Sequence, residues 1–415
     1  MSPSTDHRTF ISFITDFVSY GIAMSAVSMA TYLPLFLKTH GASDLVIGLI
    51  PAAFAAGRMT GLLVAPVIEA RPLIGRWMVA VMLVERLFLV LCGGWILAGP
   101  EAHPSLMVAG LLGLWFLYTL TNGWASTAWG AYVARALSRT QRGQLHGMGS
   151  ALVALSGLAV VPLVGLAITH FGLARGYGGA FLAAGLLLMS SCLIFLRARE
   201  EPYPHVKRPV TLSDYLHRMM PLLRADGRFR WFLTVMTLWL MGTTGASYFT
   251  VYAMERFQAD ASMVMGYTVA MSLGAGVAGL ASGRVASRVG FVHIYLFGIL
   301  GVAASMTTAF LAPTSIWFYG AFALAGAGGA ASWMAVINLP MELAEAPDVP
   351  TYYAVASVVR GPAGVLAPVA AGLYLGHFPH QPLYLFCALT SLVAAVLLVR
   401  FVREPGVAAV PAAAS

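Results

Sequence analysis

The chain contains roughly twelve apolar stretches of about 20 residues, separated by mostly short polar segments. A helix rises about 1.5 Å per residue, so each stretch is long enough to cross a hydrocarbon core of about 30 Å. The chain is 59% hydrophobic and only 10% charged, which excludes a soluble globular domain. The sequence therefore predicts an all-α polytopic membrane protein with twelve transmembrane helices. We expect spans at residues 10–37, 45–67, 77–98, 106–133, 145–170, 178–196, 229–254, 262–282, 291–312, 315–340, 352–375 and 382–402.

The positive charge follows the expected membrane topology. With both termini in the cytoplasm, 18 of the 24 lysines and arginines fall on the cytoplasmic side. This asymmetry is the positive-inside rule, and it fixes the orientation of the helices. We therefore expect a multi-pass protein of the cytoplasmic (inner) membrane whose partner is the lipid bilayer. The net charge of +8 gives no reason to expect a nucleic-acid partner.

A long polar and basic segment divides the spans into two groups of six that look related. The sequence FLKTHGASDLVIG after the first span resembles MERFQADASMVMG after the seventh. Transporters are often built from such repeats, with the substrate path between them. We expect an N-terminal six-helix half at 1–196, a cytoplasmic linker at 197–228, a C-terminal six-helix half at 229–402 and a tail at 403–415.

The segments after the second and eighth spans carry a shared motif. Residues 283–290 read GRVASRVG, which resembles the Gly-x-x-x-Asp-Arg-x-Gly-Arg loop of the major facilitator superfamily. Residues 66–76 form a longer copy, with Glu69 at the acidic position. Together with the six-plus-six repeat, these motifs make nearly the whole chain similar to that family. The resemblance implies a secondary transporter in which two six-helix halves rock around a site near the midplane, giving alternating access.

Opposite charges lie in equivalent inner loops of the two halves. The loop after the tenth span is acidic, whereas its counterpart in the first half is basic. Either these are solvated loop charges, or they form a cytoplasmic gate that closes when opposite signs meet. For such a gate we name the motif and loop residues Glu69, Arg71, Arg76, Arg139, Gly283, Arg288, Gly290, Glu342 and Glu345.

Charged residues inside the spans are candidates for ion coupling. A charge at a helix centre costs about 2.5–3.5 kcal/mol, so such residues usually face the bundle interior and find partners. The candidates are Asp16, Arg58, Glu85 and Arg360, and Arg58 could reach Asp16 or Glu85 from a similar depth. A static ion pair between helices is one interpretation, and a coupling or substrate-binding charge is the other. Because two carboxylates are buried, H⁺ is the favoured coupling ion, with sodium or facilitated diffusion left open.

Polar and aromatic side chains recur on single helix faces. Tyr118, Asn122 and Ser126 follow one another at four-residue spacing, which places them on one face. The family lines its path chiefly with the first, second, fourth and fifth helices of each half. Either these side chains bond neighbouring helices, or they line a cavity for a small amphipathic organic molecule. The expected path residues are Tyr20, Tyr118, Asn122, Ser126, Trp239, Thr244 and Tyr248.

Motifs for other chemistry are missing. The sequence has no GxxxxGK[ST], HExxH, CxxC or Gly-x-Ser-x-Gly, so we expect neither an enzyme nor a cofactor or metal. Cys92, Cys192 and Cys387 lie in apolar spans and are predicted to be core residues. We expect a monomeric, proton-coupled secondary transporter, with export slightly ahead of uptake. The alternatives are uptake or facilitated transport of a metabolite, a lipid-moving transporter, and a receptor or assembly protein that keeps the fold.

Overall fold

The computed structural model describes residues 7–99, 103–195, 200–203, 221, 226–343 and 349–402. Within these residues the chain is helical and contains no strand. The N-terminal half consists of α1 (His7–Val27), α2 (Tyr32–Thr39), α3 (Asp44–Glu69), α4 (Gly75–Ala98), α5 (Pro104–Ala136), α6 (Arg139–Phe171) and α7 (Leu173–Phe195). The C-terminal half consists of α9 (Gly227–Thr243), η1 (Thr244–Tyr248), α10 (Phe249–Phe257), α11 (Ala261–Leu311), α12 (Trp317–Leu343), α13 (Val349–Leu375) and α14 (His380–Phe401).

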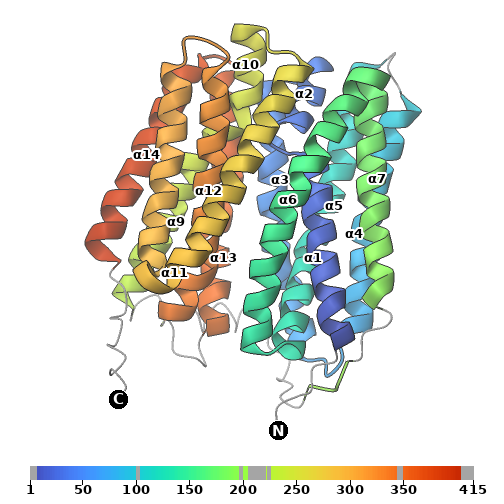
Figure 1. Cartoon of the computed structure of the whole chain (residues 1–415), viewed down its shortest axis with the longest axis vertical. Helices are drawn as coiled ribbons and strands as arrows, with labels where there is room; N and C mark the ends of the chain where they lie inside the picture. Colours follow the sequence, from blue (N-terminus) through green and yellow to red (C-terminus); the bar gives the residue numbers. More distant parts are fainter. Residues whose placement is uncertain are drawn as a thin grey trace.

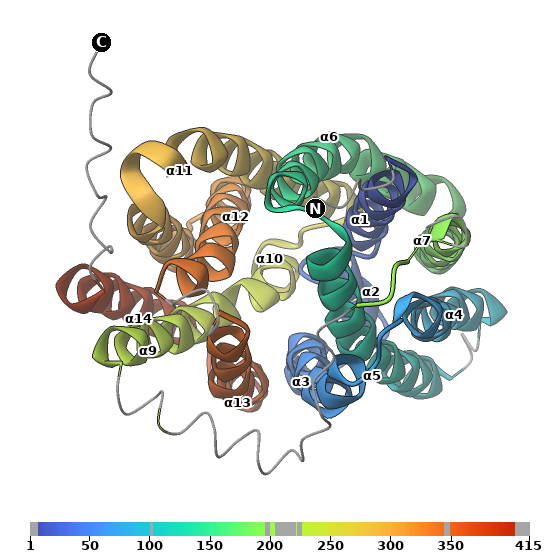
Figure 2. The ribbon, with the colours of Figure 1, turned by 90° about the horizontal axis from the view of Figure 1, so that it is seen from below.

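The helices form two bundles side by side (Figures 1 and 2). α1 begins and α14 ends at the same end of the molecule, which we call the inner end; the opposite end, where α2 and α10 lie, is the outer end (Figure 1). Among the described residues, eleven helical stretches are long and apolar enough to cross a membrane. The predicted fold of two six-helix halves is confirmed, and the seventh predicted span, 229–254, is the one that is not among these eleven stretches.

The first helix of each half is interrupted. The predicted span 10–37 divides into α1 and α2, with Ser28 at a φ of 42°. Pro34 supplies a physical reason, because in a continuous helix its ring would clash with the carbonyl of Ala30. The predicted span 229–254 divides in the same way into α9, the 3₁₀ turn η1 and α10. Both interruptions face the interface between the halves, where they leave backbone groups available for other partners.

The predicted break between spans eight and nine is a tight corner. Helix α11 runs through residues 261–311 and has one residue of non-helical backbone, Gly290, with φ 78° and ψ 166°. A positive φ is readily adopted only by glycine, so Gly290 is the residue that lets the chain reverse direction here. The motif segment 283–290 is therefore mostly helix, where the sequence suggested a loop.

Small residues let the helices approach closely. A Cβ on Gly57 of α3 would lie 2.0 Å from the carbonyl oxygen of Thr119, and one on Gly123 of α5 would lie 1.8 Å from that of Gly57. Between the halves, α3 packs against α13 and α6 packs against α11. The glycines therefore let α3 and α5 approach until their backbones are nearly in contact, as is common between membrane helices.

Candidate functional site

A cavity of about 480 Å³ lies between the two halves. Its size is in the usual range for small-molecule sites. Residues of both halves line it: Met29, Ala30, Pro51, Phe54, Ala55, Arg58, Met59, Ser126, Thr127, Trp239, Leu240, Thr243, Thr244, Ser247, Trp333, Ser357, Arg360, Gly361, Gly364 and Pro368. No aspartate or glutamate is among these described lining residues. The walls are therefore apolar and aromatic, with hydroxyl groups and two positive charges.

The two arginines reach the cavity from opposite halves at the same depth. Arg58 lies 11 residues before the inner end of α3 (Glu69), and Arg360 lies 11 residues after the inner end of α13 (Val349). At 1.5 Å per residue, both are about 16 Å from the inner end, near the middle of the membrane. The guanidinium carbon of Arg58 is 5.3 Å from the ring centroid of Trp333, and that of Arg360 is 5.9 Å from it. Both cations therefore lie beside the same aromatic ring.

The interrupted helices close the cavity toward the outer end. Met29 and Ala30, in the break between α1 and α2, line the cavity. Thr250 of α10 donates a hydrogen bond to the Ala30 carbonyl at 3.0 Å, across the interface between the halves. Lys38 of α2 pairs with Glu255 of α10 at 2.5 Å and with Asp44 of its own half at 3.1 Å. A hydrogen bond and an ion pair therefore join the halves above the cavity.

Asp16 forms an ion pair inside the N-terminal half. Its carboxylate accepts from Arg86 Nη2 at 2.5 Å and from the Ser191 hydroxyl at 2.8 Å. The other terminal nitrogen of Arg86 donates to the Leu188 carbonyl at 2.5 Å and to Ser191 at 3.0 Å. Only 4% of Asp16 and 1% of Arg86 is exposed. Asp16 is therefore not the partner of Arg58, contrary to one of the two expectations, because its carboxylate is already occupied by Arg86.

Glu85 belongs to a separate network. Its carboxylate accepts a hydrogen bond from Asn122 Nδ2 at 2.8 Å, and the same nitrogen donates to the Tyr20 hydroxyl at 3.1 Å. The Tyr118 hydroxyl lies 3.5 Å from that of Tyr20. Glu85 is 2% exposed, and no ion pair to it is found among the described residues. It is adjacent to Arg86 in sequence, but about 100° separates successive helical residues, so the two side chains face different partners.

The structure divides the expected path residues into two groups. Ser126, Trp239 and Thr244 line the cavity. Tyr20, Tyr118 and Asn122 lie in the Glu85 network within the N-terminal half, and Tyr248 donates to the Pro368 carbonyl at 2.8 Å. Tyr118 and Tyr248 are fully buried. The face that carries Tyr118 and Asn122 therefore binds neighbouring helices, and only its last turn, at Ser126, reaches the cavity.

The expected cytoplasmic gate is described only in part. Arg71, Arg76, Gly283, Arg288 and Glu342 are exposed, and Gly290 forms the corner of α11. The side chains of Glu69 and Arg139 and the whole of Glu345 lie outside the described residues. The pairing of Glu342 and Glu345 with Arg71 or Arg139 stays a prediction.

Glu200 holds the turn between α3 and α4, where the sequence suggested an acidic role for Glu69. Its two carboxylate oxygens accept from the backbone N–H groups of Ile74 and Gly75 at 2.6 and 2.7 Å. The exposed N–H groups at a helix start favour a negative charge. Residues 200–203, part of the expected linker, therefore contact the N-terminal half. Glu200 and Glu201 follow each other beyond the sixth span, and nothing in the sequence signals this role for Glu200.

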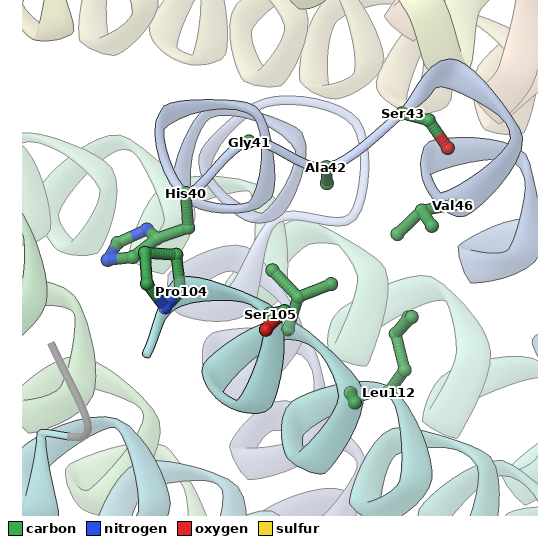
Figure 3. A pocket seen from close by; sticks show the side chains of 10 residues that line it. His40, Gly41, Ala42, Ser43, Val46, Pro104, Ser105 and Leu112 are labelled. Atoms are coloured by element: carbon green, nitrogen blue, oxygen red, sulfur yellow. The ribbon is translucent and has the colours of Figure 1, made fainter. Parts of the chain in front are cut away.

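A second hollow of about 550 Å³ lies at the outer end, in the N-terminal half alone (Figure 3). It is lined by the turn between α2 and α3, by Val46 of α3 and by the first turns of α5. His40 borders it, but its Nδ1 is bonded to the Phe36 carbonyl at 2.7 Å. The C-terminal half contributes no lining residue to this hollow, whereas both halves line the cavity described above. The described residues also contain no group of three potential ligands for a metal ion.

Sequence reasoning missed two features of the site. Trp333 is one of them, because nothing in the sequence distinguishes it from a tryptophan that packs within an apolar span. The pair of Lys38 and Glu255 was also missed, because the two residues are more than 200 positions apart. The similarity between FLKTHGASDLVIG and MERFQADASMVMG, which contain them, was the available signal.

Comparison with known proteins gave matches along the whole chain. The sequence profile described as Major Facilitator Superfamily matches residues 9–271 and 230–415. A solved D-xylose–proton symporter is similar in structure, with a TM-score of 0.72, 15% identity and coverage of 97% of this chain and 99% of that one. The xylose transporter XylE from E. coli, in a partially occluded inward-open conformation, gives a TM-score of 0.71 with 15% identity and the same coverage. The D323A mutant of the nucleoside transporter NupG gives 0.69 with 13% identity, covering 96% of this chain and 100% of that one. No curated protein matches in sequence.

Proposed function

Because the chain belongs to the major facilitator superfamily, we propose that it is a proton-coupled secondary transporter that moves a small amphipathic organic molecule across the cytoplasmic membrane by alternating access. The observation that carries this proposal is the cavity between the halves. It is built from both halves, lies at mid-membrane depth and has a mixed aromatic and hydroxyl lining. Such a composition suits an organic solute with both apolar and polar parts.

The contacts above the cavity suit a gate that opens and closes. Opening toward the outer end requires the bond from Thr250 to Ala30 and the pair of Lys38 and Glu255 to separate. Glu255 is 42% exposed, and an exposed ion pair is worth only about 0–1 kcal/mol. Breaking these contacts is therefore a modest cost, which substrate or ion binding can offset.

Glu85 is the residue that we propose carries the coupled proton. Asp16 is held by Arg86, whereas Glu85 is held by the neutral amide of Asn122. Asn122 is one helical turn from Ser126, which lines the cavity, so a proton on Glu85 lies close to the substrate site. Carboxylic acids in such intramembrane networks commonly relay protons. One solved structure of similar fold is a proton symporter.

The test uses full-length protein in liposomes. A compound from a metabolite library that raises the unfolding temperature of the purified protein serves as substrate. We expect Glu85→Gln to lose proton-driven accumulation while keeping counterflow, which needs no net proton movement. Loading the substrate inside or outside tests export, the expected direction, against uptake.

Asp16→Asn is the matched control for this experiment, because it changes a buried carboxyl group of the same half. It should lower the stability of the protein, and the part that stays folded should still couple transport to the proton gradient. Full proton-driven accumulation by Glu85→Gln would refute the coupling role. Failure to move any solute under any gradient would favour the receptor or assembly protein over a transporter.

A further inference from the structure

We propose that Arg58, Arg360 and Trp333 form a binding site for an organic anion, whose carboxylate or phosphate group lies between the two guanidinium groups and whose apolar part lies against the indole ring. This inference rests on the proposed transport function, because it names the substrate class of the same cavity. The inference narrows the proposed substrate from an amphipathic organic molecule in general to one that carries a negative charge.

The first argument is the charge of the cavity. Two guanidinium groups face one space in which the described lining residues include no carboxylate. Each charge in the membrane interior is costly, and two like charges in one cavity repel each other. A bound anion would remove both costs at once.

The second argument is a comparison with Arg86 in the same protein. Arg86 is 1% exposed and bound to Asp16, Ser191, Leu188 and Cys192, as expected for an arginine that joins helices. Arg58 and Arg360 are only partly buried, and the structure gives them aromatic ring contacts but no hydrogen bond or ion pair among the described residues. Their donor groups are therefore available to a ligand.

The third argument is geometry. The distances to the Trp333 ring, 5.3 and 5.9 Å, place the two guanidinium carbons no more than about 11 Å apart, which is their sum. Guanidinium groups bind carboxylate and phosphate oxygens in a two-pronged manner, so this arrangement fits an oxyanion held from both sides. Trp333, which lies beside both guanidinium groups, is 42% exposed, and its indole ring offers a flat surface to the apolar part of the ligand.

The other free polar groups around the cavity can also donate hydrogen bonds. Ser357 lies one helical turn from Arg360, Ser247 lies in η1, and among the described residues neither hydroxyl has a hydrogen bond. Both hydroxyl groups are therefore available to a ligand in the cavity. Since Arg58 and Arg360 belong to different halves, an anion bound to both would also link the halves.

The test is thermal unfolding of the full-length protein in a neutral detergent with matched probes. 3-Phenylpropionate and phenyl phosphate carry the two kinds of oxyanion, and 3-phenylpropionamide is the neutral counterpart. We expect one or both anions to raise the unfolding temperature in a saturable way and the amide to leave it unchanged. Sodium chloride at equal ionic strength controls for general salt effects. The two anions distinguish a carboxylate site from a phosphate site.

Variants locate the site. Arg58→Gln and Arg360→Gln should each weaken anion binding at least tenfold, and Arg400→Gln, an exposed arginine at the inner end of α14, should leave it unchanged. Arg360→Lys retains the charge without the two-pronged geometry and should give an intermediate loss. If a variant does not fold, the comparison of anion and amide on the unaltered protein still decides.

The inference is overturned if neither anion stabilises the unaltered protein, if the amide stabilises it equally, or if both glutamine variants bind the anion normally. A neutral solute that is transported would refute the anion site and leave the transport function intact. An anion that binds at this site but is never transported would support the anion site and count against the transport function.

Discussion

The ion pair of Asp16 and Arg86 offers a direct test of how the N-terminal half is held together. It connects α1 to α4, and Ser191 of α7 joins both residues. We consider Asp16→Asn, which keeps the shape of the side chain, and Arg86→Met, which keeps much of its length. Each single change leaves one polar partner buried without its opposite charge.

The expected magnitudes follow from burial. Both side chains are almost fully buried, and removing one member of a buried pair costs about 3–5 kcal/mol because the other charge is left uncompensated. Removing both charges relieves that cost, so the double variant should be little worse than one single variant. The interaction energy from the double-mutant cycle should therefore be about 3 kcal/mol, at the upper end of the usual range.

The assay is reversible unfolding of the purified protein in mixed micelles, followed as the fraction of denaturing detergent is raised. Ser191→Ala serves as a milder control, with an expected loss of about 1 kcal/mol for a hydrogen bond. Single variants that each lose less than 1 kcal/mol, with additive effects in the double variant, would refute the structural role of the pair.

Two further predictions concern the cavity and its outer closure. In a background without the native cysteines, Ser126→Cys should react with a small water-soluble thiol reagent, and substrate should slow that reaction. Tyr118→Cys should be inert. Equal reactivity of the two variants would show that both positions lie on the path. Lys38→Glu should place a third negative charge beside Glu255 and Asp44 and shift the protein toward a state open at the outer end. This shift should appear as a longer distance between spin labels on α2 and α10. Adding Glu255→Lys should partly reverse the shift, and an unchanged distance distribution in the single variant would mean that this pair does not hold the closure.

The sequence alone determined the class of fold and the positions of most helices. An apolar stretch of about 20 residues can satisfy its backbone in lipid only as a helix, so length and hydropathy were sufficient. The six-plus-six division also followed from sequence, from the long polar segment and the repeated sequences. Interruptions within apolar stretches were harder to predict. The breaks near Ser28 and at η1 lie inside stretches that were each predicted as a single span, and Pro34 was the local signal for the first of them.

The partners of the buried charges were decided only by tertiary structure. The sequence placed Asp16, Arg58 and Glu85 at membrane depths from which they could contact one another. Depth, however, does not determine which way each side chain points around its helix axis. That direction depends on how the helices are rotated and packed, and close glycine contacts such as Gly57 against Gly123 are part of that packing. A rotation of one residue, about 100°, turns a side chain from one neighbour to another. For this reason Asp16 meets Arg86, Glu85 meets Asn122, and Arg58 faces a cavity that it shares with an arginine of the other half.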